Sequence, residues 1–145
     1  MVKCSPKDKI FAVADKSGRI RVWKGSKEVH SEAHWHSLPV QALEFSKDGV
    51  HLYSGGQEGA ILKWDVRSMN QVGIVPRIGA TLTQISCTFE KVISVTANNT
   101  VKVFTAHLED VSVIRYEFQI TMSIITNFGH MHFNGKFHQN SEINQ

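Results

Sequence analysis

The sequence predicts an all-β fold of about three four-stranded antiparallel sheets that lie side by side without closing into a ring. The first observation is a repeat, because residues 4–23 align with residues 45–64 without a gap. Trp64 therefore follows Trp23 by 41 residues. The second observation is that each copy alternates short apolar runs with turn residues, which is typical of short strands. A period of about 40 residues with several strands indicates one sheet per repeat.

The clearest copy of the repeat ends on the pair Trp64-Asp65. A more divergent third copy ends on Phe104, 40 residues after Trp64, and it repeats Ser54 as Ser94. Three copies in register argue against coincidence. They predict four-stranded units over residues 1–34, 35–78 and 79–119, and the start of a further, incomplete unit over residues 120–145.

Apolar and β-branched runs set the expected strands, and Gly, Pro, Asn and Asp set the turns between them. In the first unit Gly18 closes a turn, because glycine supplies the left-handed conformation. In the second unit Pro76 ends the outer strand, since proline cannot donate a hydrogen bond to a sheet. Outside the central repeat of residues 45–65, strands are expected over 9–14, 19–23, 28–34, 40–45, 71–75, 81–86, 91–96, 100–104 and 111–118.

The repeat with its terminal Trp64-Asp65 resembles the WD-repeat β-propeller family. In that family each blade opens with a Gly-His pair, and His36 stands in register with this His while Trp35 replaces the Gly. The resemblance implies a partial WD-repeat β-propeller that is not closed. At one blade per 41 residues the chain holds little more than three blades, whereas propellers have about four to eight. We therefore expect it to be a fragment of a larger protein.

The same resemblance implies a set of structural positions, which are Trp23, His36, Trp64, Asp65 and Phe104. Members of the family commonly bury a hydrogen-bonded network of Trp, a Ser or Thr, the His and an Asp, because a buried indole N–H needs an acceptor. In the second unit the hydroxyl position is interpreted as Gly56 and the acidic position as Glu58. The network is therefore expected to be incomplete.

Positive charge is concentrated at the start of the chain. The formal net charge is +3, but residues 1–27 carry eight Lys or Arg against Asp8 and Asp15. Such a patch suits nucleic acid phosphates, because each neutralised phosphate releases counterions. It equally suits turns and a sheet edge that must stay soluble. Both interpretations stay open.

The cysteines and the apolar runs exclude other classes of protein. Cys4 and Cys87 are expected on equivalent strand positions as small buried apolar residues, which indicates a reducing compartment rather than a disulfide framework. No run has the length or apolar character of a secretory signal or of a membrane span of about 20 residues.

No catalytic or cofactor-binding residues stand out. Two pairs of histidines have strand spacing that could hold zinc or copper, namely His34 with His36 and His130 with His132, but neither has a cysteine or carboxylate at a fitting distance in sequence. No nucleophile elbow, phosphate-binding loop or paired carboxylates occur. We therefore predict no metal, no cofactor, no small-molecule substrate and no enzymatic activity.

A narrower resemblance rests on elements outside the general blade pattern. The runs Ala33-His34-Trp35-His36 and 75–82 resemble a nucleolar group of WD-repeat proteins in the small-subunit processome. This implies a non-catalytic scaffold in the nucleolus that acts in ribosome biogenesis, in pre-rRNA processing and 18S maturation, and in support of RNA polymerase I transcription. The implied partners are protein subunits of a large ribonucleoprotein assembly, and pre-rRNA or small nucleolar RNA.

Rigid loops on one propeller face are the expected partner-binding positions. They comprise Lys16, Ser17, Trp35, Gln57, Glu58, Asn98 and Asn99. Trp35 is favoured among them because aromatic anchors dominate interfaces. Two alternatives remain, which are a general protein–protein adaptor in another complex and a direct RNA-binding module that uses Lys16, Arg19 and Lys24 of the basic first blade.

Overall fold

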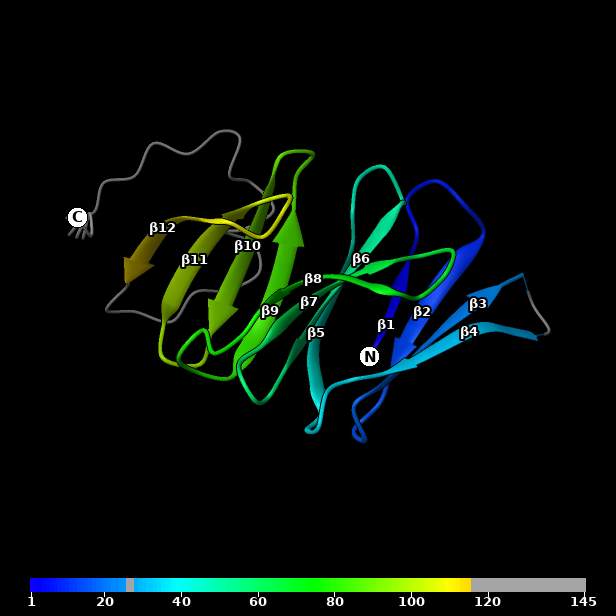
Figure 1. The fold of residues 1–145 in the computed structure, drawn as a ribbon, viewed down its shortest axis with the longest axis horizontal. Helices are drawn as coiled ribbons and strands as arrows, with labels where there is room; N and C mark the ends of the chain where they lie inside the picture. Colours follow the sequence, from blue (N-terminus) through cyan, green and yellow to red (C-terminus); the bar gives the residue numbers. More distant parts are fainter. Residues whose placement is uncertain (26–27, 116–145) are drawn as a thin grey trace.

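The structure, a computed structural model, describes residues 1–25 and 28–115. This part of the chain forms three four-stranded antiparallel sheets (Figure 1). It has no helix that could cross a membrane. The strands are β1 (Val2–Cys4), β2 (Ile10–Ala14), β3 (Arg19–Lys24) and β4 (Glu28–His34) in sheet 1, β5 (Val40–Phe45), β6 (His51–Gly56), β7 (Ile61–Asp65) and β8 (Gln71–Val75) in sheet 2, and β9 (Leu82–Cys87), β10 (Lys91–Thr96), β11 (Thr100–Thr105) and β12 (Asp110–Arg115) in sheet 3.

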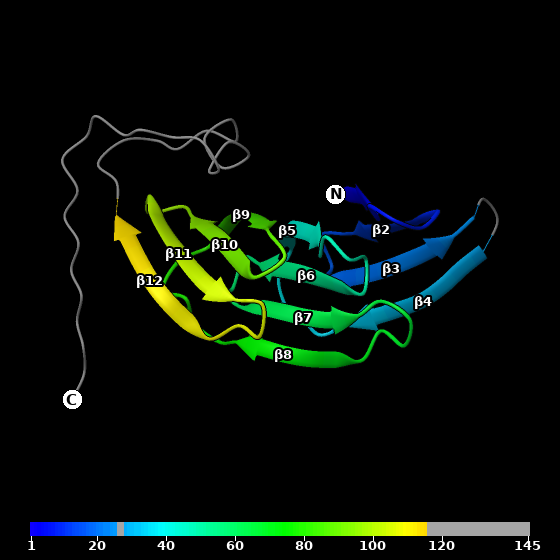
Figure 2. The same cartoon turned by 90° about the horizontal axis from the view of Figure 1, so that it is seen from above.

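The chain completes each sheet before it crosses to the next, so that spatial order follows sequence order in all three. The first strands of neighbouring sheets lie against each other, β1 against β5 and β5 against β9, while β4, β8 and β12 form the outer edges (Figure 2). The predicted fold class, an all-β array of about three four-stranded blades that does not close, is confirmed. The blade boundaries stay predictions, and the unit expected over residues 120–145 lies outside the described residues.

Corresponding strands of the three sheets carry Trp23, Trp64 and Phe104 at the same register position. Each ring-bearing residue faces the second residue of the preceding strand, since Trp23 pairs with Phe11, Trp64 with Leu52 and Phe104 with Val92. A β-bulge also recurs, because the pairing with the outer strand shifts register between the ring-bearing residue and the residue before it in all three sheets. The repeat in the sequence is therefore a repeat of geometry.

Two apolar cores lie between the sheets. In the first, Leu52 and Trp64 of sheet 2 pack with Ala12 and Val22 of sheet 1. In the second, the equivalent face of sheet 3, including Val92 and Phe104, packs with a sheet 2 face that includes Ala42, Tyr53 and Ile61. The ring-bearing faces of sheets 2 and 3 thus bury their apolar area against the preceding sheet, which is the main force that holds the sheets together.

Two glycines bring the crossovers between sheets close to the hairpin turns. Gly18 and Gly59 have φ of 85° and 77°. A Cβ on Gly59 would stand 2.8 Å from the Ala80 carbonyl oxygen, and a Cβ on Gly18 would overlap the backbone of His36. Because only glycine combines this conformation with this proximity, each turn docks on the crossover that follows its sheet. The Ile78 amide accordingly donates to the Gly59 carbonyl at 2.7 Å.

The two cysteines occupy equivalent positions but differ in burial. Cys4 pairs with Phe11, and Cys87 pairs with Val92. The expected burial is confirmed for Cys87, whose thiol donates to the Phe45 carbonyl at 2.9 Å across the interface between sheets 2 and 3. The expected burial of Cys4 is wrong, because Cys4 is exposed. Within the described residues no sheet packs against the ring-bearing face of sheet 1.

Phe104 is completely buried, whereas Phe89 in the β9–β10 turn is 76% exposed. We expect Phe104→Ala to lower the free energy of unfolding by about 3 to 5 kcal/mol, since it removes a buried ring and leaves a cavity. Phe89→Ala, the matched control, should change it by less than about 0.5 kcal/mol. Urea unfolding followed by tryptophan fluorescence measures both, and equal small losses would contradict the packing of sheet 3 on sheet 2.

Burial raises the pKa of the Cys87 thiol to about 11 from a usual value of 9.0. Between these pH values the unfolded chain releases a proton that the folded chain keeps, so the free energy of unfolding falls as the pH rises. Wild type should therefore lose about 1 to 2 kcal/mol relative to Cys87→Ala between about pH 9 and 11. Lys63, whose lowered pKa has no contribution from Cys87, titrates in both proteins and cancels in the difference. A constant difference in urea unfolding across this range would refute the assignment.

Candidate functional site

Turns and crossovers from all three sheets gather along one edge of the molecule, the lower side in Figure 1. We call it the crossover edge, and it comprises residues 15–18, 35–39, 57–60, 76–81 and 97–99. Hydrogen bonds link these segments in series. The Gln57 amide donates to the Pro39 carbonyl at 2.9 Å, the Thr81 hydroxyl donates to the Gln57 carbonyl at 3.1 Å, and the Ala97 amide donates to the Thr81 carbonyl at 2.9 Å. The edge is therefore a continuous and rigid surface.

The structure places every expected partner-binding residue on this edge. Those that are exposed are Lys16, Ser17, Trp35, Gln57 and Asn98. Asn99 is half-buried, with the left-handed φ of 59° that asparagine tolerates in a turn. Glu58 is also half-buried, and its carboxylate points inward to the His36 imidazole instead of facing solvent.

A buried hydrogen-bonded network connects Glu58 to the core of sheet 2. His36, which is fully buried, places Nε2 2.7 Å from the Ser54 hydroxyl oxygen and Nδ1 against the Glu58 carboxylate. The Trp64 indole N–H donates to the same Ser54 oxygen at 2.8 Å. With the imidazole proton on Nδ1, Ser54 donates to Nε2 and His36 donates to Glu58, so each proton has one acceptor.

The expectation of an incomplete network is therefore wrong. Its hydroxyl comes from Ser54 rather than from position 56, and Glu58 supplies the acid. Gly56 instead leaves room for the Glu58 carboxylate, because a Cβ at position 56 would overlap that carboxylate. Glutamate is one methylene longer than aspartate, and its side chain folds back into the space that glycine leaves. The recurrence of Ser54 as Ser94 was the signal that could have identified the hydroxyl from sequence.

The histidine pair considered for metal binding does not converge. Both ring nitrogens of His36 are engaged by Ser54 and Glu58, whereas Nε2 of exposed His34 lies 3.0 Å from the Ser17 carbonyl oxygen. Among the residues that the structure describes, no group of three or more His, Cys, Asp or Glu could hold a metal ion. His130 and His132 lie outside the described residues.

The remaining structural positions have local partners. Trp23 stacks on Phe11 with ring centroids 6.0 Å apart and nearly parallel planes. Asp65 lies at the other end of sheet 2, where its carboxylate accepts from the amides of Arg67 and Ser68 at 3.1 and 2.9 Å. The backbone hydrogen bond from Ser68, followed by its hydroxyl, lowers the pKa of Asp65, so this carboxylate stabilises the β7–β8 turn as an anion.

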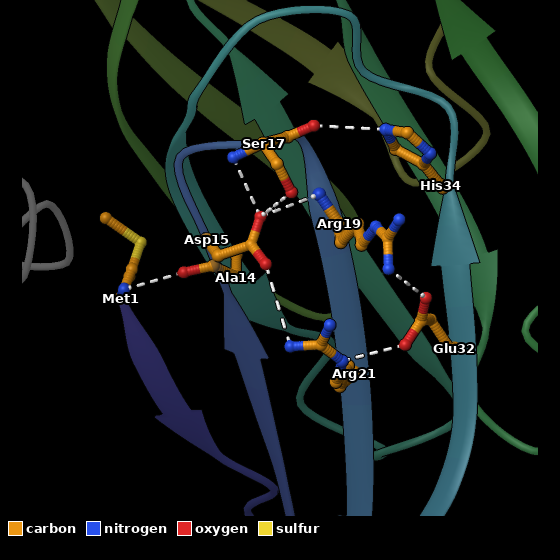
Figure 3. Close-up of polar contacts among 8 residues, drawn as sticks. All are labelled: Met1, Ala14, Asp15, Ser17, Arg19, Arg21, Glu32 and His34. Atoms are coloured by element: carbon orange, nitrogen blue, oxygen red, sulfur yellow. Dashed lines mark hydrogen bonds and ion pairs between the residues drawn. The ribbon is translucent and has the colours of Figure 1, made fainter.

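Arginines of sheet 1 are held in ion pairs near the crossover edge (Figure 3). Arg21 Nε lies 2.7 Å from Glu32 Oε2, and its Nη1 lies 3.6 Å from Asp15 Oδ2. Arg19 Nη1 lies 3.4 Å from the second Glu32 oxygen. The Ser17 hydroxyl donates to Asp15 at 2.6 Å and is the largest cause of the lowered pKa of Asp15. Arg19, a residue of the RNA-binding alternative, is thus already paired.

Two exposed apolar side chains stand on the crossover between β4 and β5. Trp35 is 43% exposed and Leu38 is 44% exposed. The Trp35 ring meets the ring of buried His36 edge to face, with centroids 5.8 Å apart. Trp35 is therefore a large, partly fixed aromatic surface on the crossover edge, which is the kind of anchor that dominates protein interfaces.

The sequence matches a family model over residues 1–101, and the model describes the first β-propeller of WD repeat-containing protein 75. WD repeat-containing protein 75 of Danio rerio is 31% identical over 106 residues, which are 70% of this chain and 13% of the relative. The Xenopus laevis protein of the same name is 36% identical over 90 residues, or 59% of this chain and 11% of the relative. The chain spans about a tenth of the length of these curated relatives.

A yeast relative and two solved structures extend the comparison. The U3 small nucleolar RNA-associated protein 17 of Schizosaccharomyces pombe is 33% identical over 78 residues, covering 52% of this chain and 10% of that protein. The structure of U3-55K has a TM-score of 0.73 at 20% identity, and that of the RRP9 WD40 repeats has 0.72 at 21% identity. Both cover 79% of this chain and 38% of the solved chain, and at this identity they support the fold alone.

The fit between Gly56 and Glu58 can be tested by a double substitution. We expect Gly56→Ala to lower the free energy of unfolding by about 1 to 3 kcal/mol, because the added methyl displaces the carboxylate. In the presence of Glu58→Asp, which shortens the acid, the same change should cost at least about 1 kcal/mol less. Urea unfolding measures the coupling.

Gly73→Ala is the matched control, because a Cβ at Gly73 meets only ordinary contacts at 3.4 Å, with Leu108 and Lys63. Its effect should be the same whether position 58 carries glutamate or aspartate. Additive costs for Gly56→Ala and Glu58→Asp would contradict the steric account.

Proposed function

We propose that this chain, which belongs to the family of WD repeat-containing protein 75, is part of a non-catalytic scaffold that acts in ribosome biogenesis. The support from sequence is its similarity to proteins of that name and to a U3 small nucleolar RNA-associated protein. The support from geometry is the crossover edge, where hydrogen-bonded segments of three sheets hold exposed side chains in fixed relation. Such a surface suits binding rather than chemistry.

In this proposal the protein resides in the nucleolus as a subunit of the small-subunit processome. There it supports pre-rRNA processing, 18S maturation and RNA polymerase I transcription. Its partners are protein subunits of a large ribonucleoprotein assembly, with pre-rRNA or small nucleolar RNA nearby. The similarity to a U3-associated relative supports this placement, because U3 is a small nucleolar RNA.

Protein partners are proposed to bind the crossover edge with Trp35 as the anchor. The polar rim around it would be formed by Lys16, Ser17, Gln57, Asn98 and Asn99, since interfaces combine a central aromatic with solvated polar groups. Glu58 would act indirectly, by holding His36 under the Trp35 ring. The observation that carries this proposal is the exposure of Trp35 on a crossover whose next residue is fully buried.

A general protein–protein adaptor in another complex would use the same surface. The two functions are separated by location and by the particles that the protein enters. The intact, tagged protein should accumulate in nucleoli and co-purify with U3 RNA. Exclusion from nucleoli, or purification without U3 RNA, would defeat the proposed function and favour the adaptor.

Trp35→Ala should weaken association with the proteins of U3-containing particles by about tenfold or more, because it removes the aromatic anchor. Phe89→Ala is the matched control, as it truncates another exposed aromatic away from the crossover edge. The measurement is the fraction of U3 particles recovered with each variant, with urea unfolding as a check on stability. Equal recovery with both variants would show that Trp35 is not an anchor.

A further inference from the structure

A cleft of about 890 Å³ opens between sheets 1 and 2 at the edge opposite the crossover edge. Its walls come from the β1–β2 connection, the end of β3, and the β5–β6 and β7–β8 turns. Figure 1 shows these connections on the same side of the two sheets. Its charged side chains are Lys7, Lys9, Lys24 and Arg67, together with Asp8 and Asp48.

The balance of charge in this cleft is positive, since four cations face two carboxylates. Asp48 is held by local hydrogen bonds, because it accepts from the Ser46 hydroxyl at 2.5 Å and from the Val50 amide at 3.0 Å. These bonds, with that of Ser46 first, lower the pKa of Asp48. The carboxylate is therefore an anion that is hydrogen-bonded within the β5–β6 turn. Four cations and two carboxylates leave the cleft with a formal net charge of +2 for a ligand.

The arginines near the crossover edge are held in ion pairs, unlike the cations of the cleft in the part of the chain that the structure describes. Arg19 and Arg21 are paired with Glu32 and Asp15 (Figure 3). Within the described side chains, none of the four cleft cations lies within ion-pair distance of a carboxylate. Cations that outnumber the carboxylates of a concave site raise the local concentration of anions.

The arrangement of the cations favours a chain of phosphates over a single one. They come from four positions on three strands or turns rather than from one convergent nest, and the cleft also exposes apolar surface at Val50, which is 47% exposed. A single-stranded polynucleotide offers phosphates at regular intervals, with sugars and bases that can cover apolar groups between them. A phosphorylated side chain offers one phosphate and would leave most of the cations unused.

We propose that this cleft binds the phosphate backbone of single-stranded RNA through Lys7, Lys9, Lys24 and Arg67. The inference rests on the proposed function, because it assigns the RNA of the assembly to a site on this chain. It replaces the surface suggested by the sequence, of which only Lys24 belongs to the cleft. Protein and RNA would then occupy opposite edges of the same sheets.

The test compares two triple variants of the intact protein. Lys7→Gln, Lys9→Gln and Arg67→Gln remove three charges from the cleft. The matched control, Arg77→Gln, Lys91→Gln and Lys102→Gln, removes three charges that belong neither to the cleft nor to the proposed partner-binding residues. The probe is a fluorescent single-stranded RNA of mixed sequence and about 20 nucleotides, and its affinity is measured by anisotropy from low to moderate salt.

The cleft variant should bind the RNA at least about tenfold more weakly, and the slope of log K against log salt should become shallower by about 2, since three phosphate contacts are lost at about 0.7 each. The control should lose less than about threefold. Equal losses in both variants, or a wild-type affinity that ignores salt, would overturn the proposal. So would a cleft variant that loses a phosphoserine peptide but retains RNA.

Measuring how much U3 RNA co-purifies with the wild-type protein distinguishes a failure of this inference from a failure of the proposed function. If wild type enters the particles and the cleft variant still binds RNA normally, the cleft assignment fails alone. If wild type does not enter the particles but binds RNA through the cleft, the proposed function fails and the site stands.

Discussion

The packing of the ring-bearing faces of sheets 2 and 3, each on the sheet before it, is the interaction on which the rest of the structure depends. Leu52 and Trp64 close the first interface, and Val92 and Phe104 close the second. Short four-stranded sheets have little stability alone, so their apolar faces must be covered by neighbours. The burial of Cys87 follows from the second of these contacts, since its thiol donates to the Phe45 carbonyl of sheet 2.

The His36 network connects the packed core between sheets 1 and 2 to the crossover edge. Trp64 lies in the core between sheets 1 and 2, Ser54 joins it to His36, and His36 belongs to the crossover that carries Trp35. A residue offered to partners is therefore fixed by a core ring through Ser54 and His36. At the opposite edge the cleft presents charge instead, which gives the two edges different chemistry.

The sheets, their order and most strands could be predicted because they depend on local patterns, namely the 41-residue period, alternation and glycine turns. Three features could not. The hydroxyl of the network depends on cross-strand register rather than on spacing to the turn, so Ser54 was missed in favour of Gly56. The burial of Cys4 depends on a neighbouring sheet. The pairing of Arg19 depends on Glu32, which is 13 residues away along the chain but on the adjacent strand.

The close fit of Gly56 and Glu58 also constrains how such a blade can diverge. A residue larger than glycine at position 56 requires an acid shorter than glutamate at position 58. A shorter acid at position 58 with glycine kept at position 56 would no longer reach the His36 imidazole. Either single substitution alone therefore gives a less stable protein. Homologous blades should consequently carry one of two linked pairs, and the two positions should covary across evolution.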